Sequence, residues 1–384
     1  MRKTGNIKLE LRHITREKDF DKVISKLRQA NFIAVDLEFD SNHHHYGFKL
    51  CLMQIFCGNT VYLIDPQYVD IKRIFPFLED ENIEKIVFSF GEDLKLLHSL
   101  NCNPKNIYDI SIAVKLLNYD KISLSDVVEK HPGIILEKGS QKSDWCRRPF
   151  SEKQKIYAAN DVLYLPQIAD LIKNETRRKG IENWIYEENK ALEKSGAGGE
   201  NKNSIKNKDG RNMTQTQWNF YRQLWNFREE KAKILDKPPH QVIDNNFLKE
   251  IAVNPSLLNN WAKNKFIHRA LKNVETGRYL KKLYEDTKKN AKKDAIPEDE
   301  PAFKRPSKDE VRKNREKRNQ AEKIKEEIFK PVQAAIRNDY GENAVTFILS
   351  NKLMDELIRG DKTNLRNYKR ELFLKYSEKI GKYL

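Results

Sequence analysis

The chain has 384 residues, of which 39% are hydrophobic and 33% are charged, and its mean hydropathy is −0.78. This composition can build buried cores, and no stretch approaches the ~20 apolar residues that a membrane-spanning helix requires. The N-terminus carries basic residues but no apolar core segment, which argues against a signal peptide. We therefore expect an intracellular, cytoplasmic protein.

The net charge of +16 is unevenly distributed along the chain. Residues 1–190 hold 29 Lys and Arg against 28 Asp and Glu, whereas residues 191–384 hold 43 against 28. A basic half of this kind commonly meets a polyanion, above all nucleic acid. A lysine-rich surface that only faces solvent is the alternative.

The first half of the chain alternates strand-like and helical patterns. Strands are predicted at 8–14, 32–39, 50–56, 60–66 and 84–90, and helices at 16–29, 71–80, 93–100, 109–118, 124–131 and 152–175. Because strands come early and helices dominate late, this order favours an α/β domain with one mixed sheet.

Two segments of the chain have the composition of linkers. Residues 193–212 are rich in Gly, Asn and Lys, and residues 295–309 contain three prolines. They divide the chain into predicted domains at 1–192, 213–294 and 308–384. The second and third domains show helical periodicity alone, which predicts two small all-α domains.

The four cysteines, Cys51, Cys57, Cys102 and Cys146, lack C-x-x-C spacing and paired histidines. We therefore predict free thiols in a reducing compartment and no zinc site. The stretch "SDWCRRP" places Trp145, Arg147 and Arg148 before a helix. These side chains either meet phosphates of a nucleic acid or hold the loop in place.

The stretch "FIAVDLEFDS", residues 32–41, ends an apolar strand with carboxylates. Asp36 and Glu38 point to the same face because side chains alternate along a strand. Unpaired, the two groups repel each other, and a divalent cation such as Mg²⁺ would relieve that repulsion. Two exposed acids at a strand end are the alternative interpretation.

Further acids follow in three other stretches. Asp93 lies at a strand-to-helix turn in "FSFGEDLKLL", and Asp109 stands at a predicted helix start, where it would serve as the N-cap. Tyr157 and Asp161 are four residues apart in "IYAANDVLYL", so they share one face of a helix. Spacing alone does not decide whether these groups converge.

Together, these stretches resemble the ribonuclease D family. The resemblance covers about residues 30–175 and rests on "DLE", "FSFGEDLKLL", "IYDISIAVKLLN" and above all "QKSDWCRRPFSEKQKIYAANDVLYL" at 141–165. Members are 3′-5′ exonucleases of the DEDD superfamily, here of the subgroup with a tyrosine in the last motif. The resemblance implies a ribonuclease H-like mixed-sheet exonuclease domain. The segment 220–252, and less closely 308–384, resembles the HRDC-type helical modules that follow this domain.

The resemblance implies a complete catalytic site. The first motif supplies Asp36 and Glu38, the second Asp93, and the third Tyr157 and Asp161. The four acids would bind two divalent metal ions, Mg²⁺ or Mn²⁺, that clamp the scissile phosphate. Tyr157 would orient the attacking water by a hydrogen bond, because a free tyrosine, with a pKa of about 10, is not a base at pH 7.

The function implied is that of a metal-dependent 3′-5′ exoribonuclease. It would bind RNA with a free 3′ hydroxyl, trim tRNA-like or other structured RNA ends, and release nucleoside 5′-monophosphates. Two alternatives stay open: a 3′-5′ exonuclease that acts on DNA, and a catalytically inactive scaffold that binds RNA.

Overall fold

The computed structural model describes residues 10–136, 139, 143–195, 205–304 and 306–384. It contains two compact units, one of residues 1–39, 50–199 and 310–384, the other of residues 40–49 and 200–309. The division into three domains stays a prediction, and the structure adds that the last segment packs with the first. Within the predicted linker at 193–212, residues 196–204 lie outside the described residues.

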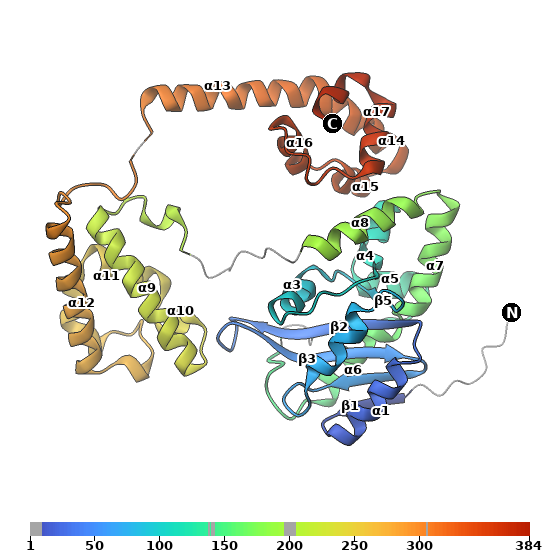
Figure 1. The fold of residues 1–384 in the computed structure, drawn as a ribbon, viewed down its shortest axis with the longest axis horizontal. Helices are drawn as coiled ribbons and strands as arrows, with labels where there is room; N and C mark the ends of the chain where they lie inside the picture. Colours follow the sequence, from blue (N-terminus) through green and yellow to red (C-terminus); the bar gives the residue numbers. More distant parts are fainter. Residues whose placement is uncertain (1–9, 137–138, 140–142, 196–204, 305) are drawn as a thin grey trace. The chain divides into compact units, whose positions relative to one another are not determined.

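The first unit is built on a six-stranded mixed sheet (Figure 1). The strand order is β1-β4-β3-β2-β5-β6. β1 is parallel to β4, β3 is antiparallel to β4, and β5 is parallel to both β2 and β6. The strands are β1 (Glu10–Ile14), β2 (Phe32–Ser41), β3 (Phe48–Cys57), β4 (Thr60–Ile64), β5 (Glu84–Val87) and β6 (Ile107–Asp109).

Helices flank this sheet, with α6 on β4, α7 on β5 and α8 on β6. The expectation of a mixed sheet followed by a mostly helical region is confirmed. The helices of the nuclease part are α1 (Glu17–Leu27), α2 (Phe75–Glu79), α3 (Gly91–Ser99), α4 (Ile110–Leu116), α5 (Leu124–Lys130), α6 (Glu152–Leu163), α7 (Leu165–Arg178) and α8 (Glu182–Ser195).

The single helix predicted over 152–175 is wrong, because α6 ends at Leu163 and α7 begins at Leu165. Pro166 stands in the first turn of α7, where its missing N–H costs no helical hydrogen bond. The break lets the two segments take separate directions.

Strand β6, which the sequence pattern missed, is the edge of the sheet and only three residues long. Its backbone N–H groups donate to side chains of α8: Ile107 to Glu193 at 3.1 Å and Asp109 to Asn189 at 3.0 Å. These contacts cover an edge that would otherwise be open to pairing with another strand.

The C-terminal helices complete the first unit. They are α13 (Lys308–Ile324), α14 (Lys330–Tyr340), α15 (Glu342–Ile348), α16 (Asn351–Ile358) and α17 (Asn367–Tyr376). α15 packs on α4 and α17 packs on α8. Trp184 of α8 stacks on Tyr368 with ring centroids 4.8 Å apart. Buried Glu188 accepts from the hydroxyl of Tyr368 at 2.7 Å and pairs with Lys369 at 2.8 Å.

The second unit is a helical bundle of α9 (Gln215–Leu235), α10 (Pro239–Val242), α11 (Asn245–Val253) and α12 (Val274–Lys293). Its core is a separate cluster that includes Trp218, Leu224 and Trp261. Residues 40–49 belong to it, as His45 contacts Asp236 at 2.8 Å. No helix among the described residues is long and apolar enough to cross a membrane.

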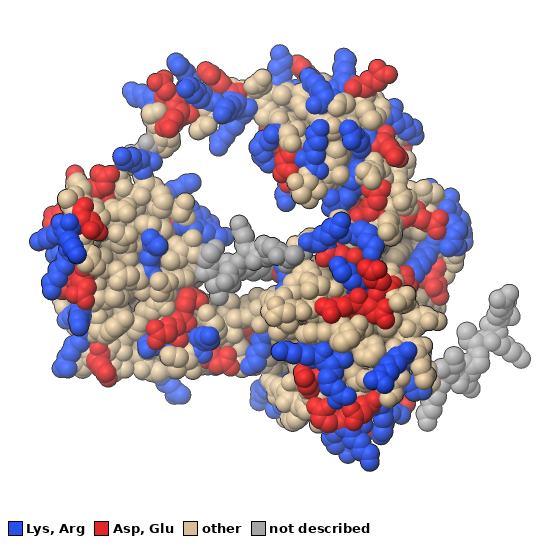
Figure 2. Space-filling view, in the orientation of Figure 1, with Lys and Arg blue, Asp and Glu red and all other residues tan. Residues whose placement is uncertain are grey.

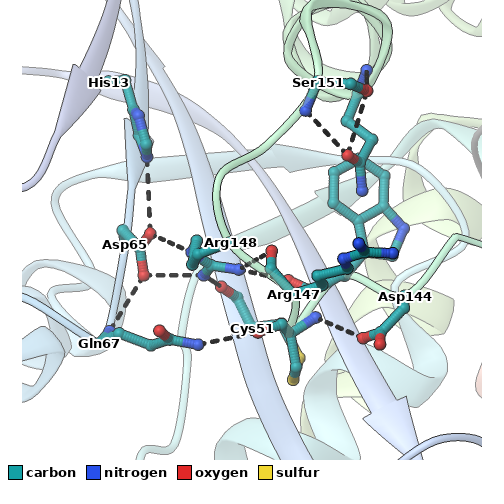
Figure 3. A network of polar contacts seen from close by, with 11 residues as sticks. His13, Cys51, Asp65, Gln67, Asp144, Arg147, Arg148 and Ser151 are labelled. Atoms are coloured by element: carbon teal, nitrogen blue, oxygen red, sulfur yellow. Dashed lines mark hydrogen bonds and ion pairs between the residues drawn. A yellow bond between two sulfur atoms is a disulfide. The ribbon is translucent and has the colours of Figure 1, made fainter.

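The loop before α6 is fastened to the sheet by one buried ion pair (Figure 3). Arg148 binds both carboxylate oxygens of Asp65, which is fully buried just after β4, and also donates to the carbonyls of Cys51 and Trp145. Burial alone would raise the pKa of Asp65, but the contact with His13 at 3.5 Å and the hydrogen bonds from Arg148 outweigh it and lower that pKa. Arg148 and Trp145 are therefore structural, whereas Arg147 is exposed.

The prediction of free thiols is wrong for two of the four cysteines. Cys51 of β3 and Cys146 of the same loop form a disulfide, with their Cα atoms 4.9 Å apart. The residues are 95 positions apart in sequence, so only the packing of the loop on the sheet brings them together. Cys57 and Cys102 are free thiols, as predicted.

Replacement of Arg148 by Met should destabilise the protein strongly, because it leaves the buried carboxylate of Asp65 without its ionic partner. The loss of one member of a buried pair costs about 3–5 kcal/mol in the free energy of unfolding. Urea denaturation at pH 7 measures this loss. The matched control, Arg147→Met, should stay within about 0.5 kcal/mol of the wild type. Equal stability of the two variants would contradict the role given to Arg148.

Candidate active site

Three carboxylates meet where β2 passes α6. Asp36 and Glu38 project from the same face of β2, and Asp161 reaches them from α6. One carboxylate oxygen of each lies within 4.8 Å of the others. Glu38 is 9% exposed, and Asp36 and Asp161 are partly buried. The sequence spacing did not decide whether the acids of these separate stretches come together. In the fold, these three do.

Asp93 joins the cluster from the first turn of α3. Its charge acts on the carboxyls of Glu38 and Asp161, and the charge of Asp36 acts on Asp93. It is only 8% exposed. A carboxylate in the first turn of a helix is favoured by the helix dipole, so this position tolerates the charge better than mid-helix would.

Asp109 is the residue that places Asp93. As predicted, its side chain caps α4 by accepting from the N–H of Ser111 at 2.9 Å. It also accepts from the N–H groups of Ser89 and Phe90, both at 2.9 Å. Those two residues form the turn into α3, where Ser89 has a φ of 58°. One buried carboxylate thus ties the start of α4 to the turn that carries Asp93.

Helix α6 is fixed at its start by a capping box between Ser151 and Gln154. One and a half turns later come Tyr157 and Asp161, which face the same side of the helix and lie close enough for the hydroxyl of Tyr157 to act on the carboxyl of Asp161. The ring of Tyr157 packs 6.0 Å from the ring of Trp145. The fastened loop therefore supports the ring of Tyr157 from behind.

The electrostatics of the cluster favour protonation of its acids. Burial and the negative charges of neighbouring carboxyls raise the pKa values of Asp36, Glu38 and Asp93 well above their ordinary range. Burial raises the pKa of Asp161 to about 7, although the nearby hydroxyl of Tyr157 opposes the shift. Burial also raises the pKa of Tyr157, so its hydroxyl is neutral at pH 7.

This arrangement suits a divalent metal ion. The charges that act on Asp36, Glu38 and Asp93 are those of other carboxyls, so the cluster holds an excess of negative charge in a buried place. Hard cations such as Mg²⁺ prefer carboxylate oxygens and would neutralise that excess. Among the described residues, Asp36, Glu38 and Asp161 are the one group of three or more potential ligands close enough to share an ion.

Asp40, the third acid in the stretch of residues 32–41, does not belong to the cluster and serves a different purpose. Asp40 is 5% exposed and accepts from the backbone N–H groups of His43 and His44, both at 2.9 Å. It therefore shapes the loop at 42–47. Loop support was one of the two interpretations of Arg148, and the structure favours it. Sequence reasoning missed the hydrogen bonds that Asp109 accepts from Ser89 and Phe90, because a bond to a distant turn leaves no local pattern.

Comparison with known proteins identifies the domain that carries this cluster. Residues 11–177 match the 3′-5′ exonuclease domain family. Ribonuclease D of Bartonella henselae is 28% identical over 280 residues, covering 69% of this chain and 69% of that protein. Ribonuclease D of a Shewanella species is 31% identical over 233 residues, covering 58% and 59% of the two chains.

The fold extends the likeness beyond the nuclease domain. The crystal structure of Escherichia coli RNase D, described as an exoribonuclease involved in structured RNA processing, superposes with a TM-score of 0.68. That superposition covers 98% of this chain and 99% of the other at 21% sequence identity. From the matched exonuclease domain, the ribonuclease D relatives and the shared fold, we conclude that the chain belongs to the ribonuclease D family of 3′-5′ exonucleases.

Proposed function

We propose that the protein is a metal-dependent exoribonuclease that trims structured RNA, including tRNA-like molecules, from the 3′ end. The single observation that carries this proposal is the cluster of Asp36, Glu38 and Asp161 within 4.8 Å on a 3′-5′ exonuclease domain. Its ribonuclease D relatives favour RNA over DNA as the substrate. The products would be nucleoside 5′-monophosphates, and a cytoplasmic location stays a prediction from the sequence.

The four acids are proposed to hold the metal. Asp36, Glu38 and Asp161 would share one ion, and Asp36 with Asp93 would contribute to a second. Bound there, divalent ions would offset the charge of the scissile phosphate and of the leaving 3′ oxygen. Both Mg²⁺ and Mn²⁺ suit an all-carboxylate set of ligands.

Tyr157 is proposed to position the attacking water rather than to take its proton. A neutral phenol can donate one hydrogen bond and accept another, and burial keeps this one neutral at pH 7. Its contact with the ring of Trp145, at 6.0 Å between centroids, holds the ring in place. Such positioning lowers the entropic cost of the reaction.

Replacement of Asp36 by Ala should abolish cleavage, because it removes the carboxylate that both proposed ions share. A 5′-labelled oligoribonucleotide incubated with Mg²⁺ should yield a ladder that shortens from the 3′ end with the wild type and stays intact with the variant. The control Asp170→Ala, which changes an exposed acid of α7, should cleave at the wild-type rate.

The same assay separates the alternatives. A 3′-phosphate on the RNA should block the reaction, and a 5′-phosphate should not. Internal cuts in a circular RNA would contradict an exonuclease.

Faster digestion of a matched DNA strand would favour the DNA enzyme, since the 2′ hydroxyl is the group that distinguishes the two. RNA binding without any cleavage would favour an inactive scaffold.

Replacement of Tyr157 by Phe should lower kcat on the order of 10²-fold and leave KM nearly unchanged, as one preorganised hydrogen bond is lost. Steady-state kinetics on a short oligoribonucleotide provide the measurement. Tyr164→Phe, at the end of the same helix, is the matched control and should keep the wild-type kcat. An effect of Tyr157→Phe on KM alone would assign the hydroxyl to substrate binding instead.

The unusual pKa values predict how stability depends on pH. Because the pKa of Asp161 is raised to about 7, the folded state binds more protons than the unfolded state between about pH 4 and pH 7. Without metal, the free energy of unfolding should therefore fall as the pH rises through this window. Asp36→Asn removes one repelling charge, so in EDTA at pH 8 it should raise Tm above that of the wild type.

Two controls accompany this measurement by differential scanning calorimetry. At pH 5 the difference in Tm should shrink, because the wild-type carboxyls take up protons. Added Mg²⁺ should raise the Tm of the wild type, since a ligand that binds only the folded state stabilises it, and should affect Asp36→Asn much less. A variant that is less stable than the wild type in EDTA at pH 8 would contradict the account.

A further inference from the structure

The second unit contains a pocket of about 530 Å³ beside α9. Aromatic rings, the side chain of Ile205 and polar side chains line it together. We call it the α9 pocket, and the residues that define it here are Trp218, Trp225, Phe303, Arg222, Asn207 and Asn226.

The aromatic wall of the α9 pocket is rigid. Trp218 stacks on Tyr221 with centroids 5.5 Å apart and planes 20° apart, and Phe303 meets it edge-on at 5.4 Å. The chain passes so close at Gly210 that a Cβ atom there would lie 2.4 Å from the Trp218 ring and 2.8 Å from the Phe303 ring. Glycine is therefore required for these rings to lie where they do.

The ring of Trp225 is also held in place, by a contact with the side chain of Arg228. The guanidinium carbon of Arg228 lies 4.2 Å from its ring centroid. Arg228 is only 2% exposed and is itself held by a 2.6 Å hydrogen bond to the side chain of Asn245. The indole of Trp225 is only partly buried and lines the pocket. A flat, preformed and half-exposed ring is a surface on which another planar group can stack.

The polar members of the lining have unused hydrogen-bonding capacity. Arg222, Asn207 and Asn226 are exposed, and their side chains make no hydrogen bond or ion pair within the described part of the chain. An adjoining hollow of about 250 Å³ shares Arg222 and Asn226 and adds the amides of Asn219 and Asn290 and, at its edge along the chain, the carboxylate of Asp294. Guanidinium and amide groups together offer both donors and acceptors along this surface.

The charge of this region favours a polyanion. Residues 205–304 hold 21 Lys and Arg against 13 Asp and Glu. Figure 2 shows Lys and Arg side chains gathered along α12, the helix that borders the adjoining hollow. Stacking rings, free amides and a positive field are what a single strand of nucleic acid requires, because its bases are unpaired and its backbone is negative.

We propose that the α9 pocket binds an unpaired base of single-stranded RNA, with the base on Trp225 and with Arg222 at its edge or at the adjacent phosphate. The inference rests on the proposed function in that RNA is the substrate. It deepens that function by assigning the helical bundle its own contact with RNA, built from the bundle's own residues and distinct from the acidic cluster. Duplex RNA is not a ligand, because its bases are stacked and paired.

The test measures binding with the full-length chain in EDTA, so that RNA stays uncut. Fluorescence anisotropy with a labelled 12-nucleotide single-stranded RNA should show that Trp225→Leu weakens binding about tenfold, the loss expected for one stacked base. Arg222→Gln should weaken it severalfold. The matched controls lie on the exposed face of α12: Arg278→Gln removes the same charge, and Tyr279→Leu removes an aromatic ring. Both should stay within about twofold of the wild type.

The design separates the possible outcomes. Arg222 is exposed, so Arg222→Gln tests the pocket even if Trp225→Leu lowers stability. Equal losses in Arg222→Gln and Arg278→Gln would reduce the effect to general charge and overturn the proposal. Unchanged RNA affinity in both pocket variants would overturn it as well and point to a peptide as the occupant.

Failure of the pocket can be told from failure of the proposed function. If the wild type cleaves RNA with Mg²⁺ but the pocket variants bind RNA normally in EDTA, only this inference is wrong. If the wild type cleaves nothing, yet binds single-stranded RNA in a way that depends on Trp225, the pocket stands and the exonuclease proposal falls.

Discussion

The crowding of four carboxyls into one partly buried place is the constraint on which the rest of the first unit depends. Asp36, Glu38 and Asp161 lie within 4.8 Å, and Asp93 adds its charge. Such a cluster costs folding free energy, which the surrounding structure must supply. The capping box of α6, the three hydrogen bonds that Asp109 accepts and the buried ion pair of Arg148 with Asp65 are contacts of that kind. Each of them fixes an element that carries, or supports, one of the four acids or Tyr157.

The C-terminal helices also stabilise the sheet that carries the acidic cluster. Glu188 of α8 is paired with Lys369 and hydrogen-bonded to Tyr368, and Trp184 stacks on the same tyrosine. α8 in turn covers the open edge of the sheet through Glu193 and Asn189. A segment that looks from its charge like a separate RNA-binding module is thus also part of the support of the nuclease sheet. Its removal would therefore disturb the folding of the nuclease part as well as change the charge of the chain.

The parts of the site that could be predicted are those with a local signature. The strand that carries Asp36 and Glu38 two positions apart and the helix that carries Tyr157 and Asp161 four positions apart each leave a short periodic pattern, and the family resemblance joined them. The two acids do not end the strand, as the sequence suggested, because β2 continues to Ser41. What could not be predicted depends on distant contacts. The bonds of Asp109 to Ser89 and Phe90 and the pairing of Cys51 with Cys146 exist only once the loop or turn has packed. The edge strand β6 is three residues long, too short for alternation to be recognised.

The difference between local patterns and distant contacts also explains why the basic half of the sequence predicted less about binding sites than the neutral half did. Net charge predicts attraction to a polyanion but says nothing about where a base would sit, because screening by salt makes such attraction diffuse. The α9 pocket supplies what charge cannot: rings held by Arg228 and by the close approach at Gly210, beside an arginine and amides with free hydrogen-bonding groups. Specific contact with a single strand needs this preformed surface, since a flexible side chain would lose in conformational entropy much of what stacking gains. On this proposal, the positive charge of the bundle raises the association rate of RNA, and the pocket lowers its dissociation rate.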